Sequence, residues 1–325
     1  MKKTVLFIAA VALLAFTGTA MADINIKLAV VTKPGSAQNI VAAKFEELIA
    51  QRSGGNISVK VYHSASLGNE TEILQQIQMN TIQMAVITGG PFDTFDPIVR
   101  VVSYPFLLKD YAQADAILDG PLGAEILKSL ERSKIKGLCF SENGFRNLSN
   151  NKRPVNTPED VKGLKIRVMS STIHKSIWQA LGANPTPMPW PIYTELEQGV
   201  IDGQENPLWV MEVYKFYEIQ KYMTMTRHVY SCHIDVASLD WWNSLNPADQ
   251  ALIQKTIHDA AVFERQDNRS KNAARLAMLK EKGMQIVENP DIQAFRARVA
   301  DLKNLDLYSD PQVKALLEKI LDATR

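Results

Sequence analysis

Cysteine is the rarest residue in this 325-residue sequence, which contains only Cys139 and Cys232. Their separation excludes the Cys-x-x-Cys pair of a dithiol redox centre. A disulfide between them would need Cα atoms within about 5.5 Å of each other, and the sequence does not decide this. We expect two buried free thiols, with a disulfide as the alternative.

Histidine is also scarce, and the sequence lacks the common motifs of catalytic and cofactor sites. The five histidines, at positions 63, 174, 228, 233 and 258, show no metal-binding spacing. There is no Gly-x-Gly-x-x-Gly, no phosphate loop, no His-Glu-x-x-His and no Gly-x-Ser-x-Gly. We therefore expect no metal and no cofactor. Glu205 is a general base in principle, but no nucleophile or proton partner can be identified for it.

Charge of one sign is not in excess either. The chain carries 36 basic and 35 acidic residues, and 46% of its residues are hydrophobic. The balanced charge excludes the basic surface typical of proteins that bind nucleic acid or anionic membranes. The hydrophobic content permits a large core, which at this length usually divides into two domains.

Long apolar runs are absent after the N-terminus. The run from Val5 to Phe16 is too short to span a bilayer comfortably. It follows the basic Met1-Lys-Lys3 and precedes the small residues of Ala20-Met-Ala22, which is the pattern of a secretory signal peptide. We expect residues 1–22 to be a signal peptide that is cleaved after Ala22, so that the mature chain is exported.

The first part of the mature chain alternates between strand and helix patterns. Strands are predicted at 24–30, 57–61 and 84–88, with helices at 37–53 and 70–80 between them. This alternation indicates an α/β fold with a parallel sheet and right-handed crossovers. Ligands of such sheets bind beyond the carboxyl ends of the strands. Glu70 and Thr88 lie at these ends, in loops rich in hydroxyl groups. A charge in the first turn of a helix, favoured by the macrodipole, is the equally weighted alternative for Glu70.

The second part repeats the alternation. Strands are predicted at 135–147, 163–168 and 222–238, and a single long helix from Pro247 to about Lys282. No flexible linker separates the two alternations. The chain is therefore expected to form two lobes that are joined by strands, braced by the long helix, and able to close by a hinge over a ligand.

The stretch from Gly163 to Pro207 combines three groups suited to a small polar acid. Arg167 ends a short strand and offers a rigid fork of donors for a carboxylate. Trp190 lies between two prolines and presents a flat apolar face, and Asn206 offers a donor and an acceptor. The alternatives are a surface charge or structural salt bridge for Arg167 and simple loop packing for Trp190.

Several motifs resemble the binding proteins of tripartite ATP-independent periplasmic (TRAP) transporters, which capture organic acids for a membrane permease. The matching pieces, in the order of the family, are Asn143-Gly-Phe-Arg-Asn147, Gly163-Leu-Lys-Ile-Arg-Val168, Leu181-Gly-Ala-Asn-Pro-Thr-Pro-Met-Pro189, Asp202-Gly-Gln-Glu-Asn-Pro207 and Lys215-Phe-Tyr-Glu218. The similarity extends over the whole mature length. It implies a periplasmic, monomeric solute receptor without enzymatic activity, which delivers its ligand to the permease subunits.

The resemblance also implies where the lobes divide and which residues face the ligand. Lobe I would comprise residues 23–143 and 232–271, and lobe II residues 144–231 and 272–325. Arg167 matches the arginine that takes the substrate carboxylate in the family. Glu70, Thr88 and Trp190 fall at positions where the family places groups that face the ligand.

Two further candidates come from the sequence pattern. Arg146, 21 residues before Arg167, is expected to bind a carboxylate oxygen or a neighbouring hydroxyl of the ligand. His233 lies on the polar side of the 222–238 strand together with Ser231 and Asp235. It is the best candidate on that strand to complete the cleft, with a solvent-facing histidine as the alternative.

The substrate is predicted from the chemistry of these groups. The indole of Trp190 suits the apolar face of a sugar ring, and Glu70 suits hydroxyl groups but repels a second carboxylate. A sugar acid such as a hexuronate is therefore favoured. The alternatives are a C4-dicarboxylate, whose second carboxylate Arg146 would serve, then sialate, and last a periplasmic enzyme that acts on sugar acids.

Overall fold

A computed structural model of the protein describes residues 24–325; the expected signal peptide, residues 1–22, lies outside the described residues. The nine strands of this part form one sheet. They are β1 (Ile24–Ala29), β2 (Ile57–Tyr62), β3 (Met84–Thr88), β4 (Ile135–Asn150), β5 (Lys165–Val168), β6 (Asn184–Pro187), β7 (Gly203–Asn206), β8 (Tyr222–Ser238) and β9 (Gln285–Val287).

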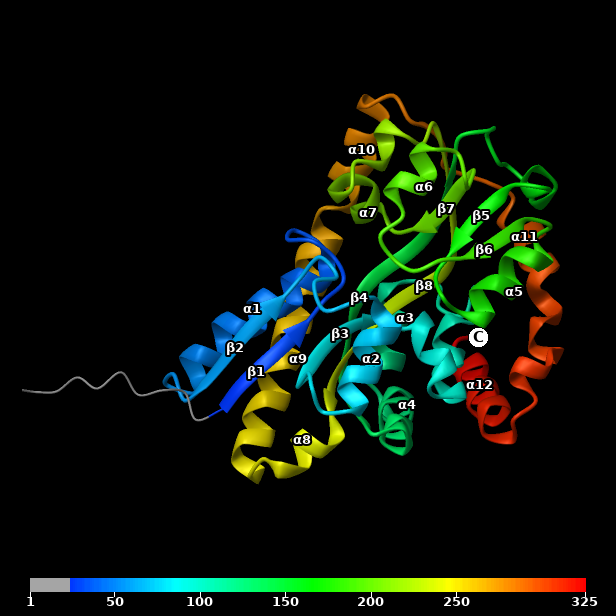
Figure 1. Cartoon of the computed structure of the whole chain (residues 1–325). Helices are drawn as coiled ribbons and strands as arrows, with labels where there is room; N and C mark the ends of the chain where they lie inside the picture. The colour runs from blue at the N-terminus through cyan, green and yellow to red at the C-terminus, as the bar shows by residue number, and fades with distance from the viewer. Residues whose placement is uncertain (1–23) are drawn as a thin grey trace, which may run out of the picture.

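The sheet is continuous because two long strands run through both halves of the molecule (Figure 1). The strand order is β2-β1-β3-β8-β4-β7-β5-β6, with β9 beside β8. β1 pairs in parallel with β2 and β3, as the alternation predicts, and β5 pairs in parallel with β6 and β7. β4 and β8 pair antiparallel, with three register shifts, and connect these two parallel groups. The mixed α/β fold with strand crossings between two halves is therefore confirmed.

The helices cover both halves of the sheet (Figure 1). They are α1 (Ala37–Arg52), α2 (Glu70–Gln78), α3 (Tyr111–Leu118), α4 (Pro121–Ser129), α5 (Thr172–Ala180), α6 (Tyr193–Glu197), α7 (Leu208–Val213), α8 (Leu239–Ser244), α9 (Pro247–Ser270), α10 (Asn272–Glu281), α11 (Ile292–Val299) and α12 (Pro311–Ala323). No helix among residues 24–325 is both long enough and apolar enough to cross a membrane.

The helix starts that surround the site follow from local capping. The Ser36 side chain accepts a hydrogen bond from the backbone N–H of Asn39 and caps α1. Asn69 and Glu72 form a reciprocal capping box at the start of α2. These caps fix the first turn of each helix, so Gln38 and Glu70 are held at the ends of the strands β1 and β3.

The single long helix predicted to reach Lys282 is wrong, because the helix ends at Ser270 and a second one starts at Asn272. The Arg275 guanidinium donates to the backbone oxygen of Asn268 at 2.9 Å and to its side-chain oxygen at 2.6 Å. These bonds satisfy a carbonyl group that the end of α9 leaves free. Two helices therefore take the place of the single long helix that was expected to brace the lobes. α9 packs on α1 and β4, and α10 packs on α7.

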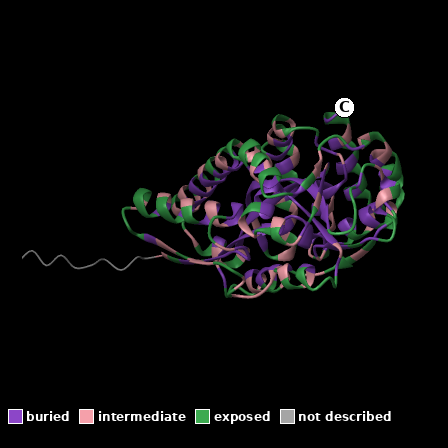
Figure 2. Cartoon of the chain, turned by 90° about the horizontal axis from the view of Figure 1, so that it is seen from above, coloured by how far each residue is buried: buried purple, intermediate pink, exposed green. Residues whose placement is uncertain are grey.

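The interior is apolar on both faces of the sheet, with exposed residues on the outer helices (Figure 2). Cys139 and Cys232 belong to different buried clusters, and both are free thiols. The expectation of two buried thiols is thereby confirmed. Asp235 lies beside Cys139, and it accepts hydrogen bonds from the Ser141 hydroxyl at 2.8 Å and from the Cys139 thiol at 3.2 Å.

Burial raises the pKa of Asp235 from 3.8 to about 7, against the effect of its two donors. The folded chain thus keeps this proton to a higher pH than the unfolded chain does. The free energy of unfolding should fall by about 4 kcal/mol from this group as the pH rises from about 4 to 7. Asp235→Asn removes the titration, so the stability of the variant relative to wild type should rise with pH over this window.

Chemical denaturation at pH 4, 5.5 and 8 measures this difference. Asp240→Asn, at an exposed position on α8, is the matched control for the same substitution outside the core. A difference between wild type and Asp235→Asn that stays constant with pH contradicts the prediction.

Candidate functional site

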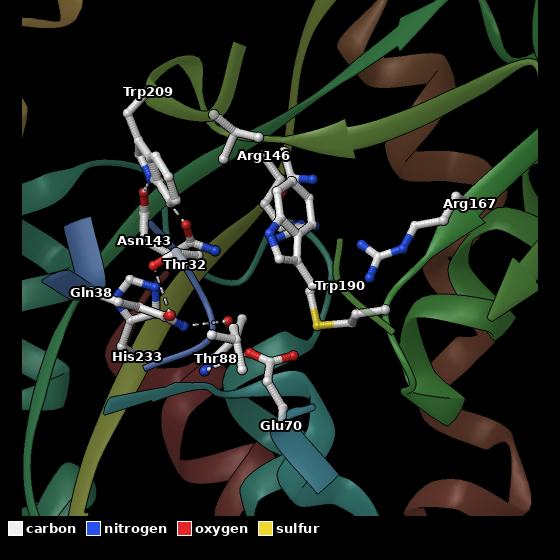
Figure 3. A pocket seen from close by; sticks show the side chains of 14 residues that line it. Thr32, Gln38, Glu70, Thr88, Asn143, Arg146, Arg167, Trp190, Trp209 and His233 are labelled. Atoms are coloured by element: carbon white, nitrogen blue, oxygen red, sulfur yellow. Dashed lines mark hydrogen bonds between the residues drawn. The ribbon is translucent and has the colours of Figure 1, made fainter. Parts of the chain in front are cut away.

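A cavity lies between the two parallel groups of strands. All seven residues predicted from the sequence line it: Glu70, Thr88, Arg146, Arg167, Trp190, Asn206 and His233. Figure 3 shows Arg167 and Trp190 on one side of the cavity and Glu70, Thr88 and His233 on another.

Arg167, on β5, is a buried cation without an acidic partner. Its Nε donates to the backbone oxygen of Met188 at 2.8 Å, and the guanidinium lies 5.8 Å from the ring centre of Trp190. No carboxylate of residues 24–325 lies within 4.0 Å of its nitrogens. Burial, followed by the charge of Arg146, lowers the pKa of Arg167 to about 10. The surface interpretation of Arg167 is therefore wrong, since the side chain is 3% exposed.

Arg146, on β4, is in contrast already paired. Its Nε and Nη2 donate to the carboxylate of Glu205 on the neighbouring β7, and Nη2 also donates to the Glu205 backbone oxygen. His228 Nε2 lies 3.0 Å from the same carboxylate and His174 Nδ1 lies 3.4 Å from it. All four side chains are buried.

The pKa of Glu205 shows the strength of this pairing. Burial acts to raise the pKa, but the charges of Arg146 and His174 and the hydrogen bonds of the two histidines hold it well below the ordinary value. Glu205 is therefore an anion whose two oxygens are occupied, and its low pKa makes it a weak proton acceptor, which argues against a role as a general base. The sequence motif contains Glu205, but only the pairing of β4 with β7 brings it to Arg146.

The wall formed by α1, α2, β3 and β8 carries no free cation. Glu70 is the first residue of α2, and one oxygen accepts from the backbone N–H of Thr88 at 3.2 Å. Burial raises its pKa, although Thr88 and the charge of Arg167 act in the opposite direction. Glu70 thus lies in the first turn of α2 and also lines the cavity. The two predictions for it, a first-turn helix charge and a cavity residue, are both compatible with the structure.

His233 pairs with Thr88 in the β3–β8 register. The side chain is 1% exposed, so the solvent-facing alternative is wrong. Burial and the charge of Arg146 lower the pKa of His233 to about 3, which makes the imidazole neutral. Its Nδ1 has no hydrogen-bond partner among the described residues.

Trp190 lines the cavity and also packs against its own half of the molecule. Its ring lies 4.6 Å from Tyr214 and 5.9 Å from Phe216, measured between ring centres. The Tyr214 hydroxyl accepts a hydrogen bond from the backbone N–H of Lys33, in the loop after β1, at 3.0 Å. The aromatic wall is therefore tied to the opposite side of the cavity.

Asn206 ends β7, and its amide nitrogen donates to the Gln204 side chain at 2.6 Å. Trp209, on α7, donates from Nε1 to the backbone oxygen of Asn143 at 2.9 Å and to its side-chain oxygen at 3.1 Å. Trp209 and Asn143 both line the cavity.

Seven lining residues were not selected from the sequence: Val31, Thr32, Gln38, Asn143, Met169, Trp209 and Val210. A signal existed for two of them. Asn143 begins a family motif, and Thr32 belongs to the loop at the end of β1. The others lie on elements whose apolar or helical pattern gives no sign of a cavity.

The described residues contain no group of three or more histidine, cysteine, aspartate or glutamate side chains arranged to hold a metal ion. Among the described residues, the site thus combines one cation without an acidic partner, an aromatic face and several amide and hydroxyl groups. These features define a receptor for a small anionic molecule.

Comparison with known proteins identifies the family. Residues 28–305 match the model of the bacterial extracellular solute-binding protein family 7, DctP. The chain is 32% identical over 317 residues to the 2,3-diketo-L-gulonate-binding periplasmic protein YiaO of Escherichia coli, which covers 97% of this chain and 96% of YiaO.

Solved structures share this fold over almost the whole chain. The sugar acid binding protein DctPAm of Advenella mimigardefordensis, in complex with galactonate, has a TM-score of 0.88 and 30% identity, covering 94% of this chain and 98% of that one. A TRAP solute binding protein from Bradyrhizobium, in complex with galacturonate, has a TM-score of 0.87 and 30% identity, covering 92% and 99%. Other matched proteins are named for C4-dicarboxylate, sialic acid and D-erythronate.

The chain belongs to the family 7 extracellular solute-binding proteins, which are the periplasmic binding proteins of TRAP transporters. It is a transport protein and not an enzyme, as its relatives are binding proteins.

Proposed function

We propose that this protein binds a six-carbon sugar acid, such as a hexuronate or an aldonate, and delivers it to a TRAP permease. The main support for this proposal is the buried guanidinium of Arg167, which lines the cavity without an acidic partner. An unpaired buried charge is unfavourable, and a ligand carboxylate removes the penalty through two parallel hydrogen bonds. Trp190 then lies against the apolar face of the sugar, with Asn206 beside the carboxylate.

The charges around the cavity favour a single carboxylate. A C4-dicarboxylate would need a second cation, and Arg146 is neutralised by Glu205. The opposite wall presents the Glu70 carboxyl and the neutral imidazole of His233. Arg146 keeps one guanidinium nitrogen, Nη1, for a hydroxyl or a carboxylate oxygen of the ligand, as predicted from the sequence.

The relatives support the same choice. YiaO is named for a keto-sugar acid, and the two matched structures contain galactonate and galacturonate. A C4-dicarboxylate remains the second candidate, because one relative that is 33% identical over 276 residues is named for it. Sialate ranks third, since Trp190 narrows the cavity.

We further propose that the ligand is enclosed by two lobes, residues 23–143 with 232–271 and residues 144–231 with 272–325. Gly144, with a φ of 113°, faces Ser231 in the β4–β8 ladder, where the register shifts. Such an irregularity lets both strands bend at the proposed boundary.

We also propose that the receptor acts as a monomer in the periplasm, once the signal peptide has been cleaved after Ala22.

A thermal-shift screen tests the ligand class. A hexuronate or aldonate at a hundredfold excess over its dissociation constant should add about 2.7 kcal/mol to the free energy of unfolding. Succinate, malate and sialate are the comparison ligands. Stabilisation by succinate or malate, with none from any uronate or aldonate, contradicts the sugar acid.

A further inference from the structure

A chain of buried hydrogen bonds forms the cavity wall opposite Arg167. It connects Ser36, Thr32, Gln38, Thr88 and Glu70, all of which are at most 9% exposed. The Ser36 and Thr32 hydroxyl oxygens are 2.6 Å apart, and the Thr32 hydroxyl donates to Gln38 Oε1 at 3.0 Å. Gln38 Nε2 donates to the Thr88 hydroxyl oxygen at 3.3 Å (Figure 3). The Thr88 backbone N–H then donates to Glu70.

The amide of Gln38 gives this chain a direction. A glutamine side chain accepts hydrogen bonds at its oxygen and donates them at its nitrogen. Gln38 therefore accepts from Thr32 on one side and donates to Thr88 on the other. Because Gln38 donates to Thr88, the Thr88 hydroxyl proton points away from Gln38. The hydroxyl and the backbone of Thr88 both lower the pKa of the Glu70 carboxyl, which is the effect expected of donors directed at it.

The ligand therefore meets hydrogen-bond acceptors on this wall. One Gln38 N–H donates to the Thr88 hydroxyl oxygen and the Thr88 backbone N–H donates to one oxygen of Glu70, which leaves the second Glu70 oxygen to accept a hydrogen bond from the ligand. The groups that face Glu70 across the cavity are the cations Arg167 and Arg146, and His233 is neutral. A ligand that places its carboxylate at Arg167 thus brings its far end to the acceptor wall.

We propose that Gln38 is a positioning residue that makes this wall select hydroxyl donors over a second carboxylate. The proposal rests on the proposed function of the cavity and assigns to Gln38 a role that acts through Thr88. Without the amide, the Thr88 hydroxyl is free to rotate and its proton no longer favours Glu70. The cavity then loses its preference for polyhydroxy acids, while Arg167 still binds a carboxylate.

Isothermal titration calorimetry with D-galactonate and succinate tests the proposal on the mature chain. Gln38→Met removes both hydrogen bonds at similar volume, and we expect about tenfold weaker binding of D-galactonate, which corresponds to one hydrogen bond. Binding of succinate should not weaken, so the ratio of the two affinities falls. Gln51→Met, at an exposed position on the same helix, is the matched control and should leave both affinities unchanged.

A double-mutant cycle separates positioning from direct contact. Thr88→Val should weaken D-galactonate binding by a similar factor, and the double variant with Gln38→Met should be no weaker than Thr88→Val alone. Thr88→Ser, which keeps the hydroxyl, should retain more affinity than Thr88→Val. A simple loss of structure would instead lower both ligand affinities together.

Three results overturn the inference. The first is unchanged D-galactonate binding in Gln38→Met, and the second is an equal loss for D-galactonate and succinate. The third is additive losses of about a hundredfold in the double variant, which would make Gln38 an independent ligand contact. Wild-type protein that binds succinate but not D-galactonate overturns the proposed function as well, so the two failures can be told apart.

Discussion

Arg167→Lys should weaken binding of the sugar acid by about one to two orders of magnitude. Lysine keeps the charge but replaces the planar fork by a point charge that cannot hold both carboxylate oxygens. A charged hydrogen bond in a closed cavity contributes about 1.5–3 kcal/mol, which is the expected loss. Calorimetry with D-galacturonate and D-galactonate measures it. Arg298→Lys, which changes an exposed guanidinium paired with Glu159, is the control.

A second variant at this position distinguishes binding from structure. Arg167→Met removes a buried cation that has no acidic partner in the unliganded protein, so it should abolish binding and raise the melting temperature of the ligand-free protein. A structural salt bridge would give the opposite sign. Unchanged affinity in Arg167→Lys, or a lower ligand-free melting temperature in Arg167→Met, contradicts the role assigned to Arg167.

Glu205→Gln should destabilise the protein by about 3–5 kcal/mol, because it leaves the Arg146 cation buried without its counter-charge. For a chain of this size the loss corresponds to a melting temperature lower by roughly five to eight degrees. Thermal unfolding of the ligand-free protein measures the change. Glu288→Gln breaks an exposed pair with Lys280 and should leave the melting temperature nearly unchanged.

The paired substitution Arg146→Met with Glu205→Leu gives the matching test. It removes both charges of this pair, so neither partner is left buried without its counter-charge, and the protein should be less destabilised than Glu205→Gln alone. A Glu205→Gln variant as stable as wild type would show that Arg146 does not depend on this carboxylate. In that case Arg146 would be free to serve a second ligand carboxylate, and the C4-dicarboxylate would gain support.

The order of strands and helices was predictable because it follows local rules. Alternating apolar residues and capping side chains fix β1, α1, β2, α2 and β3, and β8 spans Tyr222–Ser238 as predicted. The break after Ser270 was not predictable, since no proline or glycine marks it. In the folded chain, Arg275 on α10 bonds back to Asn268 on α9, a contact that the sequence pattern does not reveal.

The sequence motifs also selected two arginines that line the cavity, but they did not show which of the two has an acidic partner. Family motifs select Arg146 and Arg167 alike, and both line the cavity. Their difference arises from a partner that is 59 positions away from Arg146, since the pairing of β4 with β7 supplies Glu205 to one arginine and nothing supplies an acid to the other. Burial then enlarges the difference, because an unpaired charge is costly only where water is excluded.

By itself, the sequence determined the α/β alternation, the family and seven of the fourteen residues that line the cavity, because local patterns and motifs carry this information. Only the tertiary structure decided which cation is free for a ligand, that His233 is buried and neutral, and that Gln38 belongs to the site. The physical reason is that pKa values and hydrogen-bond directions depend on neighbours that are distant in the chain and on the exclusion of water around them.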